Sequence, residues 1–254
     1  MSTAAALAFS TPSFGERVSS LLDRVDYRLA LTDADRDDIF RLRYEAYLRE
    51  GVVAPSFAQR TSDRFDDLDN SWTFGVYIDD VLASSIRLTV ANSDVPELPA
   101  MGVFSDILTP QLEAGRTIVD PTRFVADRKM RSRFPKLPYV TIRIALMAAE
   151  FFRSDMLLAT VRTEHQAFYN RVLGHHLMAE ARPYPGLSKP ISMMGLDYLA
   201  ARRSVEQRHP FFHSTHFERR ALFQPGNETQ RKWKVPTLPA EATVVTPAFA
   251  RAAG

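Results

Sequence analysis

Residues 116–125 read RTIVDPTRFV, a β-branched and apolar run that is interrupted by one proline. This composition is typical of a β-strand. Pro121 has no backbone N–H to donate to a neighbouring strand, so it is tolerated only at a sheet edge or next to a bulge. The stretch therefore predicts a strand that is irregular in its second half.

Strands and helices are predicted on both sides of this stretch. Residues 72–78 (WTFGVYI) and 81–91 (VLASSIRLTVA) read as two strands of a hairpin, with two aspartates in the tight turn between them. Residues 138–152 hold an apolar helix. Residues 156–162 (MLLATVR) are almost continuously apolar, which indicates a strand in the middle of a sheet.

The ends of the domain follow the same alternation. Residues 25–31 alternate apolar and polar side chains, as a half-buried strand does. Thr32 is a predicted N-cap for a helix that ends at Gly51. We expect a short helix over residues 165–173 and two last strands, and we expect a proline-rich loop with at most one helical turn over residues 92–115. This order predicts a mixed central sheet flanked by helices on both faces, an α/β (α+β) architecture.

Composition bounds the class of protein. The chain has 254 residues, of which 45% are hydrophobic and 24% charged, so no disulfide or metal is needed to stabilise a core. The absence of cysteine excludes a thiolate metal site and a cysteine nucleophile. A net charge of +2 gives no overall attraction to nucleic acid. We found neither a signal peptide nor a transmembrane segment and expect a cytoplasmic protein.

We expect three parts along the chain. Residues 1–20 are small and polar and are expected to form a flexible N-terminus, and residues 21–200 form the folded domain. Residues 201–254 are expected to be a C-terminal extension with a short helix followed by aromatic and proline-rich coil.

Four short segments contain residues of a recognisable pattern. They are LRYEAY (42–47) on the first long helix, DDLD (66–69), Arg87 in a central strand and DPTRF (120–124). Their order and spacing resemble those of the acyl-homoserine lactone synthases over about residues 27–180. That family has an arginine and an aromatic residue on the first helix and two acids three apart. An arginine on a central strand follows, and then an acid before Ser/Thr-Arg-Phe.

Three departures favour a related group. Asp120 stands where the family usually has Glu, and Tyr47 stands where Phe is common. The tryptophan expected soon after Gly51 is absent. The sequence therefore more closely resembles the N-acyl amino acid synthases, which share the fold and the acyl donor. The resemblance implies a GNAT-like acyl-CoA N-acyltransferase fold and an acyltransferase activity.

The resemblance also implies the substrates. A fatty acyl chain would move from acyl carrier protein to the amine of an amino acid, with no tightly bound cofactor and with acyl-coenzyme A as an alternative donor. One alternative is an acyl-homoserine lactone synthase that uses S-adenosylmethionine. Another is a catalytically inactive binding protein of the same fold. The glycine-rich coenzyme A loop of acetyltransferases is absent, which favours a carrier protein as the donor.

Candidate catalytic residues lie in the DPTRF segment. An amine that attacks a thioester must first lose a proton, and we assign this base to Asp120. The alternative is an acid that caps the chain or pairs with Arg123. By the resemblance, a bulge near Pro121 would direct backbone N–H groups of Thr122 and Arg123 toward the developing oxyanion.

Candidate substrate-binding residues come from all four segments and the nearby strand. They are Arg43, Tyr47, Asp66, Asp69, Trp72, Arg87 and Phe124. Arginines on central strands need acidic partners, and Asp66 and Asp69 are predicted to pair with Arg87 and Arg123. Arg43 would then bind the acceptor carboxylate. The alternative is a purely structural network of ion pairs.

A basic cluster follows the central strand, and its members are Arg128, Lys129, Arg131, Arg133 and Lys136. Basic residues near a helix N-terminus suit phosphate groups, so the cluster is predicted to bind phosphopantetheine and the carrier protein. The alternative is a solvated run of charges. The six histidines show no helical HExxH arrangement, and no metal is expected. The alternative is a metal site at His213 and His216.

Overall fold

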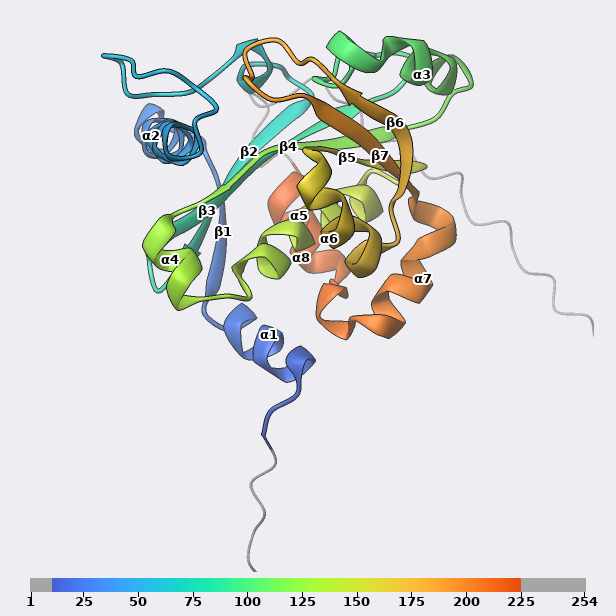
Figure 1. Cartoon of the computed structure of the whole chain (residues 1–254). Coiled ribbons are helices and arrows are strands. Elements are labelled where there is room, and N and C mark those ends of the chain that lie inside the picture. Colours follow the sequence, from blue (N-terminus) through green and yellow to red (C-terminus); the bar gives the residue numbers. More distant parts are fainter. Residues whose placement is uncertain (1–10, 225–254) are drawn as a thin grey trace, which may run out of the picture.

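The computed structural model describes residues 11–224 and forms one mixed sheet with helices on both faces (Figure 1). The strands are β1 (Val25–Leu29), β2 (Ser71–Ile78), β3 (Val81–Ala91), β4 (Ile118–Ala126), β5 (Met156–Val161), β6 (His176–Arg182) and β7 (Ile191–Asp197). The helices are α1 (Phe14–Leu22), α2 (Asp33–Arg49), α3 (Met101–Glu113), α4 (Arg128–Arg133), α5 (Leu137–Phe151), α6 (Thr163–Leu173), α7 (Tyr198–Arg208) and α8 (His216–Phe223). Two 3₁₀ turns are η1 (Arg64–Asp66) and η2 (Pro210–Phe212).

The sheet is antiparallel except at its centre. Its seven strands follow the order β1-β2-β3-β4-β5-β7-β6. β4 and β5 are parallel, and they pair only at Ile118 with Met156 and at Val119 with Leu157. Beyond these two positions the strands separate. The mixed sheet with helices on both faces, which the order of elements predicted, is confirmed.

Two apolar clusters hold the helices against opposite faces of the sheet. The larger one packs α1, α5, α6, α7 and α8 against alternate residues of the strands, such as Trp72 and Phe74. The other packs α3 against the remaining face of β4, β5 and β7. α2 covers that same second face beside β3 and β4. Side chains of a strand alternate between faces, so each strand contributes to both layers.

Local sequence signals predicted several elements correctly. The side chain of Thr32 accepts a hydrogen bond from the backbone N–H of Asp35 and caps α2, as predicted. Asp79 and Asp80 have φ values of 51° and 62° and form the hairpin turn between β2 and β3. Two consecutive positive φ angles are the geometry of a type I′ turn, which matches the twist of the strands.

One expected loop is wrong: residues 101–113 form α3. Its buried side chains Phe104, Leu108 and Leu112 recur every four residues and face the sheet. Pro110 lies inside the helix, and the backbone is kinked at Phe104. The prolines of this region favoured a loop, but the apolar repeat stabilises a helix once a sheet face is present to cover it.

Both expected boundaries of the domain cut through helices. α1 begins at a capping box formed by Ser13 and Glu16, and its Val18 is fully buried, so the folded part begins before residue 20. α7 runs across residue 200. Residues 1–10 of the expected N-terminus and 225–254 of the expected extension lie outside the described residues. No helix within residues 11–224 is long and apolar enough to cross a bilayer.

The segment after residue 200 is joined to the core by a buried arginine. Arg143 of α5 donates hydrogen bonds to the backbone carbonyls of Phe211 and His213, at 3.1 and 2.7 Å. It also pairs with Glu218 of α8 at 2.8 Å. A buried guanidinium needs such partners, so α8 belongs to the folded domain.

Candidate active site

Two rows of polar side chains cross the sheet on the face covered by α2. In the register of β2, β3 and β4, one row joins Thr73, Arg87 and Thr122, and the next joins Ser71, Thr89 and Asp120. The rows are adjacent because every second residue of a strand faces the same side. Residues about 50 positions apart in sequence, such as Thr73 and Thr122, therefore lie in the same row.

A bulge in β4 lies between these rows and the strand end. Pro121 still pairs with Leu88, but the ladder shifts between Thr122 and Val125. Arg123, inside the shift, has a φ of 54°, a conformation that is uncommon for a residue with a Cβ atom. The bulge that Pro121 suggested is therefore present, and it begins just after the proline.

The conformation of Arg123 is held by a cluster of charged side chains. Arg123 donates to one carboxylate oxygen of Asp63 through Nε and one terminal nitrogen, at 3.1 and 2.5 Å. Arg87 donates to the other oxygen of Asp63 at 2.5 Å. Arg43 pairs with Asp66 at 2.8 Å, and both side chains are almost fully buried. Asp66 is also within 3.2 Å of Arg87.

The two carboxylates of the cluster stay ionised. Burial opposes the charged form of Asp63, but Arg87 and Arg123 outweigh it and lower the pKa of Asp63 to about 2. Burial also disfavours the charged form of Asp66, and Arg43 and Arg87 lower its pKa below the ordinary value. Opposite charges at such distances favour the ionised state. The cluster is thus a permanent set of ion pairs at neutral pH.

Asp63, and not Asp69, is the partner of the strand arginines. Asp63 caps η1 by accepting the N–H of Phe65 at 2.9 Å, while Asp66 accepts the N–H of Asp63 at 3.0 Å. This turn directs both acids toward the sheet. Asp69 is exposed and forms no ion pair with a described residue, so its predicted pairing is wrong.

A cavity of about 410 Å³ lies where β4 and β5 separate. On the α2 side it is lined by Tyr47, Arg49, Glu50, Asp63, Arg87, Tyr184 and Leu187. On the side of α5 and α6 it is lined by Pro138, Phe168 and Tyr169. These residues belong to the two opposite layers of the molecule. The cavity therefore passes through the gap in the sheet and gives access to β4 from both faces.

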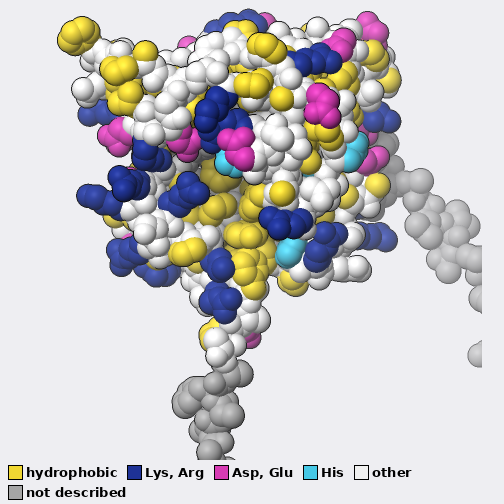
Figure 2. Space-filling view, viewed as in Figure 1, with side chains coloured by type: hydrophobic (Ala, Val, Ile, Leu, Met, Phe, Trp, Pro, Cys, Tyr) yellow, Lys and Arg dark blue, Asp and Glu magenta, His cyan; other side chains and the backbone are white. Residues whose placement is uncertain are grey.

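The cavity lining carries more positive than negative charge. Its five arginines are Arg49, Arg87, Arg123, Arg131 and Arg162, whereas Glu50 and Asp63 are its two acids. Arg123 also stacks over the ring of Tyr47, 5.6 Å from its centroid. In Figure 2, hydrophobic side chains form a hollow on this face that is bordered by lysine and arginine side chains. The site favours anionic ligands that also carry apolar groups.

Asp120 lies beside the cavity and does not line it. One carboxylate oxygen, Oδ2, accepts the backbone N–H of Ala100 at 3.0 Å, and Oδ1 has no hydrogen-bond partner within the described chain. Burial raises the pKa of Asp120 to about 6, although the Ala100 hydrogen bond and the charge of Arg87 oppose the rise. The pairing of Asp120 with Arg123, which was the alternative to its role as the base, is not formed.

The structure brings together most of the predicted site residues. Those that line the cavity are Tyr47, Arg87, Thr122, Arg123, Phe124 and Arg131. Arg43 and Asp66 lie beneath them in the ion cluster. Trp72 does not belong to the site, because it faces the other layer and packs against Phe152 with ring centroids 4.9 Å apart.

The predicted basic cluster is divided. Arg128 and Lys129 point away from the cavity into solvent, and only Arg131 of the five lines it. Arg133 and Lys136 border a second groove, formed with α1. A run of charges cannot face a single ligand on a helix, since consecutive residues are about 100° apart around its axis.

The sequence analysis missed several lining residues, among them the charged or ionisable side chains Glu50, Asp63, Arg162 and His165. Arg162 pairs with Glu50 at 2.8 Å and lies 2.9 Å from the Nε2 atom of His165. Burial first, and Arg162 second, lower the pKa of His165. Asp63 had a signal in the sequence, since an Asp three residues before Asp66 is the spacing of a capping box. The others become neighbours only through the fold.

The comparisons with known proteins show the family and the fold of the chain. The model of the family described as N-acyl amino acid synthase FeeM matches residues 38–197. The structure of FeeM, an N-acyl amino acid synthase from uncultured soil microbes, has a TM-score of 0.58 and 22% identity. It covers 71% of this chain and 94% of that chain. No protein in the curated set matches the sequence.

Two further solved structures share the fold. The CoA-dependent acyl-homoserine lactone synthase MesI has a TM-score of 0.51 and 19% identity, covering 76% of this chain and 97% of that chain. The acyl-homoserine lactone synthase LasI has a TM-score of 0.51 and 12% identity, covering 70% of this chain and 94% of that chain. The GNAT-like fold that the motifs implied is confirmed.

Proposed function

The chain belongs to the family of the N-acyl amino acid synthase FeeM and is an acyltransferase, and we propose that it moves a fatty acyl chain from acyl carrier protein to the amine of an amino acid. The observation that carries this proposal is the cavity between β4 and β5, which combines an apolar lining with an excess of arginines.

The gap between the two strands suits the acyl donor. Once β4 and β5 separate, backbone N–H and C=O groups along the gap lack a neighbouring strand. An extended thioester arm with amide groups pairs with such an edge as a strand does. Phe168 and Tyr169 offer apolar surface to the acyl chain. The arm bears a phosphate at its far end, which the arginines at the cavity mouth attract.

The acceptor is assigned to the α2 side of the cavity. Arg123 directs its guanidinium at Asp63, and its side chain keeps 19% of its surface exposed. Asp63 is shared by Arg87 and Arg123, so two cations compete for one carboxylate. The carboxylate of an amino acid would complete the charge balance, and its amine would then lie near the bulge in β4.

Two groups of β4 supply the chemistry. Asp120, with a pKa of about 6, is the base that accepts the amine proton through a water molecule, since the carboxyl does not touch the cavity. Backbone N–H groups of Thr122 and Arg123 at the bulge stabilise the oxyanion that forms on the thioester carbonyl. The nitrogen–carbon bond forms and the carbon–sulfur bond breaks. The proton taken from the amine returns through the water molecule to the sulfur, and the thiol leaves with the carrier.

The assignment is tested with purified protein and an acyl carrier protein loaded with fatty acyl chains. Each amino acid, its carboxamide and S-adenosylmethionine are offered as acceptors, and products are identified by mass spectrometry. We expect N-acyl amino acids and little product from the carboxamides. Arg123→Gln should raise the KM for the amino acid about tenfold or more and should raise the KM for the carboxamide much less.

Two results would contradict the proposal. If acyl-homoserine lactones were the product, the proposed acyl donor would stand, but the acceptor would not be an amino acid. Equal use of an amino acid and its carboxamide would show that no carboxylate is recognised. Arg203→Gln, which changes an exposed arginine of α7 outside the cavity, is the matched control for loss of one positive charge.

A further inference from the structure

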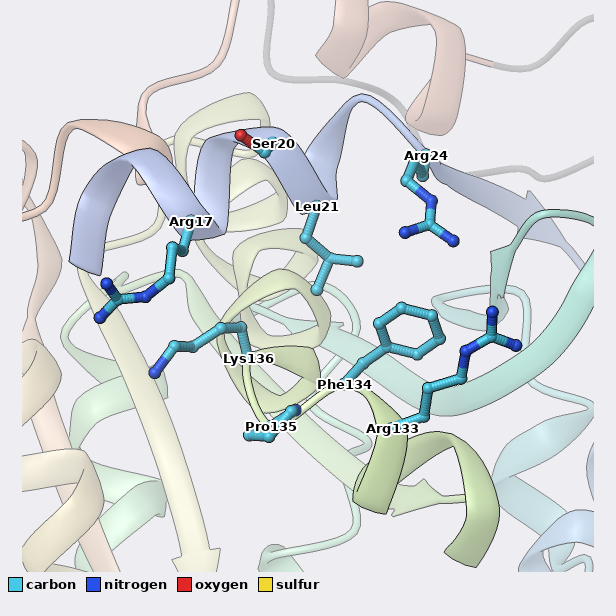
Figure 3. Close-up of a pocket in the computed structure, with 8 residues that line it drawn as sticks. All are labelled: Arg17, Ser20, Leu21, Arg24, Arg133, Phe134, Pro135 and Lys136. Carbon is cyan, nitrogen blue, oxygen red and sulfur yellow. The ribbon is translucent and has the colours of Figure 1, made fainter. Parts of the chain in front are cut away.

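A second concave surface lies between α1 and the turn that joins α4 to α5. This groove has a volume of about 210 Å³. One wall is made by Arg17, Leu21 and Arg24 at α1, and the other by Arg133, Phe134 and Lys136 (Figure 3). The short helix α4 connects it to the active site, because Arg131 lines the cavity and Arg133 lines the groove.

The charges of the groove are arranged in two pairs with apolar surface between them. In Figure 3, Arg17 and Lys136 lie at one end, Arg24 and Arg133 lie at the other, and Leu21 and Phe134 lie between the pairs. Arg24 pairs with Asp79. The other three cations form no salt bridge with any acid of residues 11–224.

This arrangement fits an acidic helix better than a single anion. A phosphate needs donors that converge on one point, whereas these cations stand at opposite ends of an apolar floor. A helix with carboxylates one or two turns apart and apolar side chains between them matches both features. The two concave walls also suit a rod more than a flat surface. The chain's own residues 225–254 contain four basic and two acidic residues, which does not complement the groove.

We propose that this groove, with Arg17 of α1 in one wall and Arg133 of α4 in the other, docks an acidic helix of the acyl carrier protein. The proposal rests on the proposed function, because it places the donor of that reaction. A carrier held here has α4 beside it, and the arm that carries the acyl chain can pass Arg131 into the cavity. α1 lies before residues 38–197, which the family model matches.

The test compares two donors that carry the same acyl chain, acyl carrier protein and free pantetheine. Arg17→Glu should raise the KM for the acylated carrier about threefold, and Arg17→Glu with Arg133→Glu about tenfold. Neither change should alter kinetics with acyl-pantetheine, which has no protein surface to dock. Added salt should weaken the use of the carrier by the wild type and should affect the double variant less.

Arg203→Glu on α7 is the matched control, since it reverses an exposed charge away from the groove. An equal loss with both donors, or the same loss in Arg203→Glu, would overturn the docking proposal. So would an unchanged KM for the carrier together with loss of binding to anionic vesicles in the double variant, because that result assigns the groove to a membrane.

Direct binding keeps the two proposals separate. Anisotropy of a labelled acyl carrier protein should rise with wild-type protein and should require an about tenfold higher concentration of the double variant. If no donor supports turnover but this difference is seen, docking stands and the proposed reaction fails. If turnover is seen and carrier binding is equal in both proteins, the reaction stands and docking at this groove fails.

Discussion

Replacement of Asp120 by Asn tests how burial and chemistry are linked at the active site. Asp120 is fully buried, and Asn keeps an oxygen that can accept the N–H of Ala100 while it removes the charge. Burial raises the pKa of the carboxyl from the ordinary value of 3.8 to about 6. A rise of this size means that ionisation of Asp120 lowers the stability of the folded state by about 3 kcal/mol.

The sign of the pH dependence follows from proton binding. Between about pH 4 and pH 6 the folded protein keeps the proton of Asp120, whereas the unfolded chain has released it. The folded state therefore binds more protons, and this group makes stability fall as the pH rises through that window. The free energy of unfolding of Asp120→Asn, relative to the wild type, should increase by about 2.4 kcal/mol from pH 4 to pH 7.

Urea unfolding at pH 4, 5, 6 and 7 measures this difference, and turnover is measured on the same samples. If Asp120 is the base, turnover of the variant should be about 100-fold lower than that of the wild type. The wild-type rate should decline below about pH 6, and the variant should not show this decline. Asp69→Asn, an exposed acid near the site, is the control and should change neither property. A difference in free energy of unfolding that stays constant with pH would show that the pKa of Asp120 is not raised by burial. Full activity of Asp120→Asn would show that Asp120 is not the base.

Two further predictions concern the ion cluster and the segment after residue 200. Asp66→Asn leaves Arg43 buried without its partner and should lower the free energy of unfolding, measured in urea, by about 3–5 kcal/mol. Asp67→Asn removes only an exposed ion pair with Arg36 and should lower it by less than about 1 kcal/mol. Equal costs would show that the buried pair is not formed. Phe223→Ala should lower the free energy of unfolding by about 3–5 kcal/mol, because the ring of Phe223 packs against Phe74 and Phe152. Phe217 lies on the same helix and is 81% exposed, so Phe217→Ala should change the melting temperature little. An unchanged melting temperature for Phe223→Ala would mean that α8 does not stabilise the domain.

The sequence predicted what depends on neighbours along the chain. The cap at Thr32, the turn at Asp79 and Asp80 and the bulge after Pro121 each depend on a few consecutive residues, and all three are present. The motifs from Arg43 to Phe124 also predicted the family, because a functional site repeats the same residue types in the same order. The segment that forms α3 was misread as a loop, since the local tendency of Pro110 to end a helix is outweighed by burial of the helix on the sheet.

Tertiary structure decided which of these residues meet. Asp63 and Asp69 are both acids three residues from Asp66, and only the direction of the turn at η1 makes Asp63 the partner of Arg87 and Arg123. Trp72 is adjacent in sequence to Thr73 of the polar row, yet strand alternation places it in the opposite layer. The cavity itself depends on β4 and β5 separating after two pairs, a contact between residues almost 40 positions apart. Local patterns set the backbone of each element, whereas register and packing, which join distant residues, set the site.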